Sequence, residues 1–185
     1  MNYIPNIISG LRVLLIPFFV LYVLNKDYDL ALYLFMFMGI SDCVDGILAR
    51  RLNCVSLFGA YLDAIADKVM INTAFYVLYI TNILPYYLFV LVICRDLIIF
   101  VGIIVNNRIN RSKEMSPIFL SKMNTFFQII LVIHCMLFLN NILSIEYIQD
   151  IINVVILTTI ASTLEYIFNY KRNIIIKNIK LSSSL

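Results

Sequence analysis

The sequence predicts an all-α integral membrane protein with six transmembrane helices and both termini in the cytoplasm, on three observations. Hydrophobic residues make up 62% of the 185 residues and charged residues only 14%, against about 25% in typical globular chains. Six apolar runs approach the length of about 20 residues that a helix needs to cross the hydrocarbon core. Lysine and arginine gather in alternate connections between these runs.

The six runs are too long for the strands of a membrane barrel, and they lack alternation between apolar and polar residues. Short polar breaks separate them, and no internal repeat or Gly/Ser-rich linker divides the chain. Residues 1–185 are therefore expected to form a single membrane domain. The expected spans are Ile7–Leu24, Leu30–Leu48, Leu57–Ile80, Pro85–Val105, Met123–Leu139 and Ile148–Tyr166.

The basic residues set the expected orientation, because cytoplasmic loops of membrane proteins are enriched in lysine and arginine. Basic residues follow the second, fourth and sixth runs, within 50–51, 108–122 and 171–180. The break after the first run has one lysine, Lys26, beside two acids, and the breaks after the third and fifth have none. The chain is therefore expected to be a multi-pass protein of a bacterial cell (inner) membrane.

Four aspartates lie in the second and third runs, where a carboxylate is costly unless it is paired or bound to a metal. Asp42 and Asp45 are three residues apart, and Asp63 and Asp67 are four apart, so each pair shares one face of a helix. A short turn around Asn53 joins the two helices. The four carboxylates are therefore expected to converge in a cavity that opens to the cytoplasm.

Such a cluster predicts a site for divalent cations, because close carboxylates raise one another's pKa unless a cation neutralises them. Oxygen ligands without histidine or thiolate select Mg²⁺, Mn²⁺ or Ca²⁺, and Mg²⁺ usually leaves positions open for substrate phosphates. Phosphoryl-group chemistry is the favoured interpretation. A divalent-cation transporter is an alternative of another class, although all four aspartates lie at one membrane face.

The stretch reads Asp42-x2-Asp45-Gly46-x2-Ala49-Arg50-x8-Gly59-x3-Asp63-x3-Asp67. It resembles the signature of the CDP-alcohol phosphotransferase (CDP-alcohol phosphatidyltransferase) family at all eight fixed positions. The opening Ile4-Pro5-Asn6-Ile7-Ile8, with Arg12, is similar to the branch that makes phosphatidylglycerol phosphate and cardiolipin. One departure is Ala64, where both branches often have proline.

The resemblance implies a homodimeric membrane enzyme that transfers a phosphatidyl group from CDP-diacylglycerol, with Mg²⁺ or Mn²⁺, two ions, as cofactor. It implies Asp67 as the catalytic general base, and no nucleic acid as partner. The implied metal ligands are Asp42, Asp45, Asp63 and Asp67. The implied nucleotide-binding residues are Asp42, Asp45, Gly46, Ala49, Arg50 and Gly59. For the small residues among them, close packing of helices is the alternative interpretation.

Arg95 and Lys122 are expected to bind the acceptor, because a charge inside a membrane helix is a functional candidate. The alternatives are pairing of Arg95 with Asp96 or with the aspartate cluster, and exposure of Lys122 at the cytoplasmic membrane surface. The phosphatidylglycerophosphate synthases that the chain resembles carry a lysine where this chain has Asn124, and Arg-Glu where it has Arg95-Asp96. A cardiolipin synthase (CMP-forming) that uses phosphatidylglycerol is therefore expected, with CDP-diacylglycerol–glycerol-3-phosphate 3-phosphatidyltransferase as the alternative.

Overall fold

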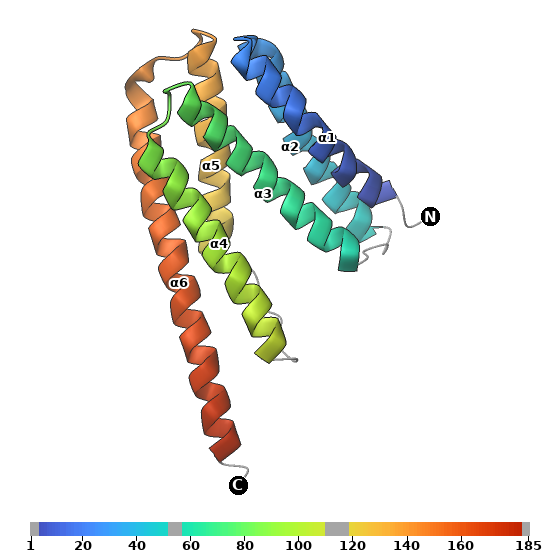
Figure 1. Cartoon of the computed structure of the whole chain (residues 1–185), viewed down its shortest axis with the longest axis vertical. Coiled ribbons are helices and arrows are strands. Elements are labelled where there is room, and N and C mark those ends of the chain that lie inside the picture. Colours follow the sequence, from blue (N-terminus) through green and yellow to red (C-terminus); the bar gives the residue numbers. More distant parts are fainter. Residues whose placement is uncertain (1–3, 52–56, 110–118, 183–185) are drawn as a thin grey trace.

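The computed structural model describes the backbone of residues 4–51, 57–109 and 119–182, and the side chains of 10–41, 65–103 and 119–169. Within these ranges all regular structure is helical, with six α-helices and one short 3₁₀ helix (Figure 1). The all-α prediction is confirmed. The elements are α1 (Ile4–Leu24), α2 (Tyr28–Arg51), α3 (Leu57–Ile80), α4 (Tyr86–Ile109), α5 (Phe119–Leu139), η1 (Ile145–Tyr147) and α6 (Ile148–Ser182).

The largest difference from the expected bounds is at the end of α6, which continues past Tyr166 to Ser182. The apolar run ends near Tyr166, but the polar segment that follows it contains no glycine or proline, the residues with the lowest helix propensity. At 35 residues, α6 is about 50 Å long, which exceeds the hydrocarbon core of about 30 Å. The helix therefore extends well beyond the membrane-spanning length.

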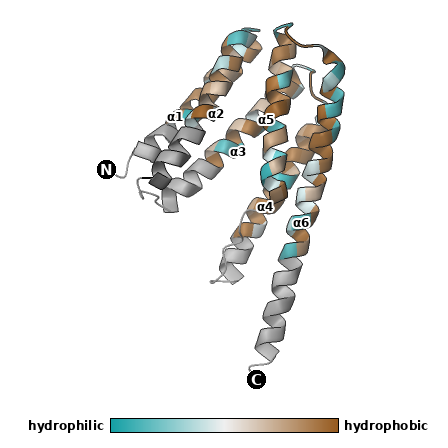
Figure 2. Ribbon diagram, turned by 180° about the vertical axis from the view of Figure 1, so that it is seen from behind, coloured by the Kyte–Doolittle hydropathy of each residue, from teal (hydrophilic) through white to brown (hydrophobic). Residues whose placement is uncertain are grey.

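Among the residues that the structure describes, three helices are long and apolar enough to cross a membrane, over Tyr86–Ile103, Phe119–Leu139 and Ile145–Asn169, as expected of a membrane protein. The described parts of α1 and α2 contain the shorter apolar helical segments Gly10–Leu24 and Tyr28–Ser41. Figure 2 shows that hydrophobic residues predominate along the described helices, with hydrophilic residues both near the upper connections and at positions within the helices. The other three spans and the orientation of the termini stay predictions.

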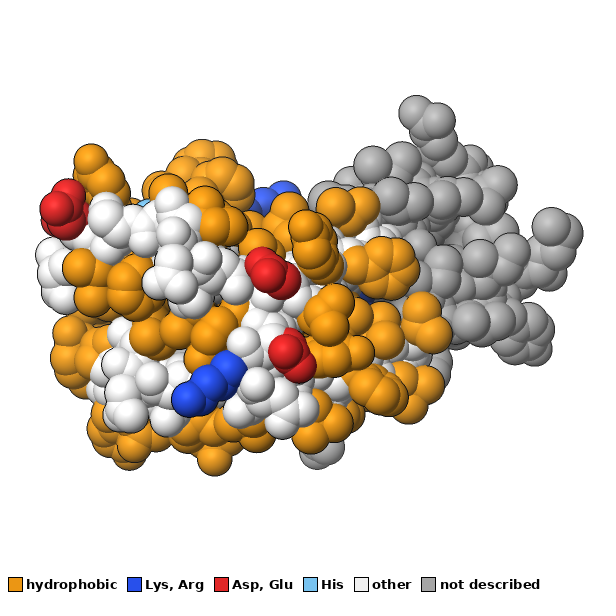
Figure 3. Space-filling view, turned by 90° about the horizontal axis from the view of Figure 1, so that it is seen from above, with side chains coloured by type: hydrophobic (Ala, Val, Ile, Leu, Met, Phe, Trp, Pro, Cys, Tyr) orange, Lys and Arg blue, Asp and Glu red, His pale blue; other side chains and the backbone are white. Residues whose placement is uncertain are grey.

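The connections after α1, α3 and α5 lie at one end of the helices, and all three use the same local structure (Figure 1). Lys26, Asn82 and Asn141 follow their helices in the left-handed conformation, with φ of 65°, 60° and 58°. The next residue donates its backbone N–H to the carbonyl five residues earlier, at 2.9–3.0 Å, which is a Schellman motif. Seen from this end, the described surface carries isolated charges among hydrophobic and uncharged polar groups (Figure 3).

The packing divides the helices into two neighbouring groups that spread apart away from this end (Figure 1). In one group α1 packs against α2 and α3, and in the other α6 packs against α4 and α5. Contacts of α3 with α4, and of α2 and α3 with α5, join the groups. The hydrophobic core at these contacts includes Phe19, Phe35, Phe75, Leu78, Leu88, Leu131, Met136 and Val155. α3 therefore contacts helices of both groups, α1 on one side and α4 and α5 on the other.

Candidate active site

Two consecutive residues of α3, Asp67 and Lys68, direct their side chains to different neighbouring helices. Asp67 forms an ion pair with the guanidinium of Arg12 on α1, and about a third of its side chain is exposed. Lys68 donates a hydrogen bond to Asp96 on α4. Successive residues of an α-helix point about 100° apart, so one turn of α3 can contact α1 on one side and α4 on the other.

Arg12 is the buried partner in the pair with Asp67, since only 1% of its side chain is exposed. A cation in such surroundings is costly unless a carboxylate and hydrogen bonds compensate it. The pair therefore fixes α1 against α3 at the level of Asp67. It also holds the carboxylate of Asp67 in a defined orientation.

Asp96 is shared between two cations and one amide. Its Oδ1 accepts hydrogen bonds from Lys68 Nζ at 2.8 Å and from Arg95 Nη1 at 2.6 Å. Its Oδ2 accepts a hydrogen bond from Asn72 Nδ2 at 3.3 Å. The side chain of Asp96 is 9% exposed, whereas that of Lys68 is 38% exposed. Lys68 is thus the more accessible of the two cations.

Arg95 joins three helices through its guanidinium, which is 2% exposed. Besides the bond to Asp96, Nη2 donates to Ser121 Oγ on α5 at 2.6 Å. Nε donates to Ser162 Oγ on α6 at 3.2 Å. The expected alternative of local pairing between Arg95 and Asp96 is therefore confirmed as a contact, while binding of an acceptor by Arg95 stays a prediction.

Lys122 and Asn124 are the two α5 residues on which the expected choice of acceptor rests, and they differ in burial. Lys122 is exposed. Asn124 is fully buried, and its Oδ1 accepts hydrogen bonds from Thr158 and Thr159 on α6, at 2.9 and 2.8 Å. Asn124, on which the expected choice of acceptor rests, therefore lies in the α5–α6 contact.

The other residues of the aspartate motif lie outside the described side chains. The backbone is helical at all eight positions, so the spacing of three between Asp42 and Asp45, and of four between Asp63 and Asp67, occurs within α2 and α3. Among the residues whose side chains are described, no three acidic, histidine or cysteine side chains form a metal site. Asp67, the described member of the implied metal ligands, presents a carboxylate, and this chemistry fits a hard divalent cation.

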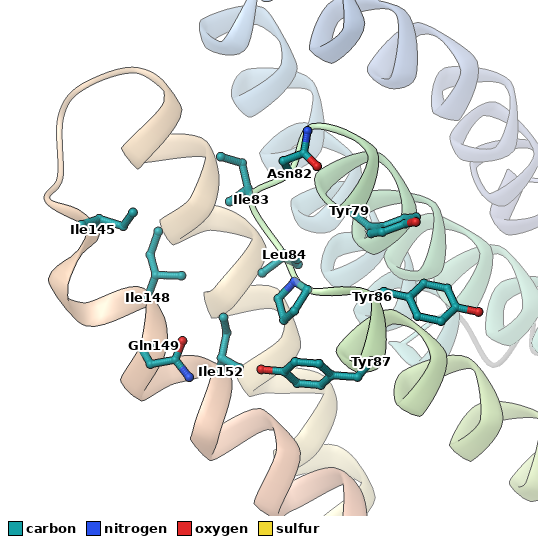
Figure 4. A pocket seen from close by; sticks show the side chains of 11 residues that line it. Tyr79, Asn82, Ile83, Leu84, Tyr86, Tyr87, Ile145, Ile148, Gln149 and Ile152 are labelled. Atoms are coloured by element: carbon teal, nitrogen blue, oxygen red, sulfur yellow. The ribbon is translucent and has the colours of Figure 1, made fainter.

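Two cavities lined by described residues lie at different levels of the fold. A cavity of about 230 Å³ between α4 and α6 adjoins Arg95 and is lined mainly by apolar residues, among them Leu91, Ile98, Ile160 and Leu164. A larger one, of about 440 Å³, lies at the end of the connections, between the α3–α4 turn and the start of α6 (Figure 4). Its lining contains tyrosines and amides but no charged side chain. The positive charge of Arg95 therefore makes the cavity between α4 and α6 the better match for an anionic substrate.

The sequence profile of the CDP-alcohol phosphatidyltransferase family matches residues 2–164, which is most of the chain. The chain belongs to the CDP-alcohol phosphatidyltransferase family. The resemblance drawn from the eight-position motif is thereby confirmed.

Relatives in this family carry the names of both enzymes that the sequence suggested. The chloroplastic CDP-diacylglycerol–glycerol-3-phosphate 3-phosphatidyltransferase 1 of Oryza sativa subsp. japonica is 32% identical over 190 residues, covering 91% of this chain and 57% of that protein. The cardiolipin synthase (CMP-forming) of Rattus norvegicus is 31% identical over 145 residues, covering 70% and 48%. The CDP-diacylglycerol–glycerol-3-phosphate 3-phosphatidyltransferase of Pseudomonas fluorescens is 49% identical over 74 residues, covering 38% of each chain. The chain thus spans about half the length, or less, of these relatives.

Sequence reasoning missed the partner of Asp67 and the degree to which Asp96 is shared. Arg12 and Asp67 are 55 residues apart, and Lys68 and Asp96 are 28 apart. The one available signal was a charged residue inside an otherwise apolar helix, which marks Arg12 and Lys68 as residues that need partners. That signal names the residues but does not say which helix supplies the partner.

Proposed function

We propose that this chain transfers the phosphatidyl group of CDP-diacylglycerol to a glycerol hydroxyl and releases CMP. The observation that carries the proposal is the complete aspartate motif of the family, placed on the helices α2 and α3. The contact of Asp67 with Arg12 supports it, because an oriented carboxylate at the last motif position suits a general base.

In the proposed reaction, the acceptor hydroxyl attacks the phosphorus on the lipid side of the pyrophosphate. A new P–O bond forms to the acceptor, the P–O bond to CMP breaks, and CMP leaves with the electron pair. Asp67 takes the proton of the hydroxyl. Arg12 keeps the Asp67 carboxylate in place through their ion pair. Because the carboxylate is held before the acceptor arrives, little reorganisation is needed at the moment of proton transfer.

The proposed cofactor is Mg²⁺ or Mn²⁺, two ions, which would neutralise the negative charge of the pyrophosphate. The residues that would hold the ions are Asp42, Asp45, Asp63 and Asp67. The nucleotide would lie against Gly46, Ala49 and Gly59, where small side chains leave room, with Arg50 near its phosphates. Support comes from the oxygen-only donor set, which hard cations prefer.

Phosphatidylglycerol is the proposed acceptor, which would make the chain a cardiolipin synthase (CMP-forming). The apolar cavity between α4 and α6 supports a lipid acceptor, since both helices are long enough to span a membrane and Arg95 adjoins the cavity. Part of one acyl chain of phosphatidylglycerol would lie against its apolar lining. Glycerol 3-phosphate is the second candidate, because two of the relatives described above are named for it.

Product analysis tests this choice. Purified protein is given labelled CDP-diacylglycerol, Mg²⁺ and each acceptor, separately and in competition, and the lipid products are separated by chromatography. The proposal predicts labelled cardiolipin with phosphatidylglycerol. Labelled phosphatidylglycerol phosphate without cardiolipin would leave the transfer reaction in place and contradict the proposed acceptor.

The proposed setting is a cell membrane, with residues 1–185 as one membrane domain, the active site facing the cytoplasm and two copies forming a homodimer. The three connections at one end of the helices would then face outward. Cysteines placed at the exposed Asp29 and Glu146, in a chain without its native cysteines, test the orientation. The proposal expects a membrane-impermeant maleimide to label both in intact cells, while a cysteine at Ser112 stays unlabelled. The reverse pattern would contradict the orientation.

A further inference from the structure

The carboxylate of Asp96 on α4 connects the two groups of helices, α1–α3 and α4–α6. Two described side-chain hydrogen bonds run from α3 to α4, and Asp96 accepts both. Lys68 Nζ donates to Oδ1 at 2.8 Å, and Asn72 Nδ2 donates to Oδ2 at 3.3 Å. Lys68 and Asn72 are four residues apart, so they lie on one face of α3. The two oxygens of Asp96 therefore hold the same face of α3.

This contact lies where α4 leaves the hydrophobic core. The buried side chains of α4 are Leu88, Val92 and Arg95, which share one face of the helix, and no described side chain from Leu97 to Ile103 is buried. Beyond this level, away from the three connections, the two groups spread apart (Figure 1). Apolar packing thus holds the groups together on one side of Asp96, and the hydrogen bonds of Asp96 hold them where they begin to diverge.

The same contact lies between the two residues that the reaction has to bring together. Arg95, which is expected to bind the acceptor, donates to Asp96 and is fixed to α5 and α6 by two further hydrogen bonds. On the other side, Lys68 directly follows Asp67, the proposed general base, whose carboxylate is paired with α1. A continuous set of contacts therefore runs from α1 through α3 and α4 to α5 and α6, by way of two pairs of consecutive residues.

We propose that Asp96 is a positioning residue, which fixes Asp67 relative to Arg95 by joining the two helix groups. The inference rests on the proposed function and adds a requirement to it. The base belongs to one group and the acceptor is held by the other, so the contact between the groups sets the distance over which the proton is transferred. A displacement of about 1 Å between reacting groups can lower a rate by about 100-fold.

The first test measures the distance between the groups and needs no turnover. Spin labels are placed at the exposed Leu14 on α1 and Phe168 on α6, in a chain without its native cysteines, and their distance distribution is measured by pulsed electron paramagnetic resonance. Asp96→Asn keeps the shape of the side chain but loses its charge and one acceptor oxygen, so the mean distance should increase and the distribution should broaden. An unchanged distribution in Asp96→Asn overturns the inference.

Two further variants complete the distance measurement. Asn72→Leu removes one of the two bonds and leaves every charged group in place, so it should change the distribution in the same direction but less than Asp96→Asn. Asp150→Asn, at the exposed start of α6, makes the same charge change away from the contact and should leave the distribution unchanged. Should Asp96→Asn not fold, wild-type distances in Asn72→Leu overturn the inference.

The second test separates positioning from a merely structural role. With phosphatidylglycerol as acceptor, Asp96→Asn should lower kcat per folded molecule by about 10- to 100-fold while the KM for CDP-diacylglycerol stays the same. Asp96→Glu restores the carboxylate and should recover most of kcat. A structural role alone would lower the amount of folded protein and leave kcat per folded molecule unchanged. That result, or equal kcat values in Asp96→Glu and Asp96→Asn, overturns the inference.

The two measurements also distinguish this inference from the proposed function. Absence of CMP release from the wild-type chain with either acceptor contradicts the proposed function, and the distance distributions then still decide whether Asp96 joins the groups. CMP release by the wild-type chain, with wild-type distances in Asp96→Asn, leaves the proposed function in place and overturns the role of Asp96 alone.

Discussion

Replacing the buried Arg95 by methionine tests whether this residue holds α4, α5 and α6 together. Arg95 donates hydrogen bonds to Asp96, Ser121 and Ser162, and each bond to a charged group contributes about 1.5–3 kcal/mol. The full loss is reduced because Asp96 keeps Lys68 and Asn72 as partners. We therefore expect Arg95→Met to lower the free energy of unfolding by about 3–5 kcal/mol, the range for breaking a buried ion pair.

The assay is unfolding of the purified protein in nonionic micelles by added SDS, followed by circular dichroism. The matched control is Lys122→Met, which removes one exposed cation from α5 and should change the free energy of unfolding by less than about 0.5 kcal/mol. Should Arg95→Met not accumulate, Ser121→Ala and Ser162→Ala each remove one bond to the charged guanidinium and should cost about 1.5–3 kcal/mol. Equal stabilities of Arg95→Met and Lys122→Met would refute the reasoning, and so would wild-type stability of both serine variants.

Two further predictions concern helix packing and catalysis. A Cβ atom at Gly102 would lie 2.6 Å from Cε1 of the buried Tyr166, so Gly102→Ala should lower the free energy of unfolding by about 1–3 kcal/mol. The control is Gly39→Ala, which should not lower the free energy of unfolding because a Cβ atom there has no neighbour within 4 Å. Equal stabilities of the two variants would contradict the close approach of α4 and α6. Asp67→Asn should reduce kcat by about 10²–10⁴ as the general base is lost, while Asp150→Asn keeps wild-type turnover. Near wild-type kcat in Asp67→Asn, measured per folded molecule, would exclude the assigned role.

The sequence predicted the helices well because long apolar runs bounded by polar breaks leave little choice of structure. α3 has the expected bounds, Leu57–Ile80. The exception is α6, where the polar segment after Tyr166 remains helical to Ser182. Hydropathy locates the part of a helix that lies in lipid, but it does not fix where the helix ends, because polar residues that favour helix can continue it into water.

The candidate site was predictable only where its members are close in sequence. The spacing of the aspartates indicated the family, which is confirmed, and the adjacent Arg95 and Asp96 suggested a local pair, which the structure contains. The pair between Arg12 and Asp67 depends on how α1 packs against α3, and one sequence carries no direct signal for such a contact. Asn124 shows the same limit. In the sequence it suggested the loss of a cation from the acceptor site, whereas in the structure its buried side chain accepts hydrogen bonds from two threonines of α6.

Acceptor-dependent release of CMP tests the central claim most directly. Purified chain in lipid vesicles is given CDP-diacylglycerol and Mg²⁺, and free CMP is measured over time with and without phosphatidylglycerol. The account predicts that CMP appears with the acceptor, in amounts equal to the new lipid product, and that little appears without it. CMP release that does not depend on any acceptor alcohol, or no release with either phosphatidylglycerol or glycerol 3-phosphate, would contradict it.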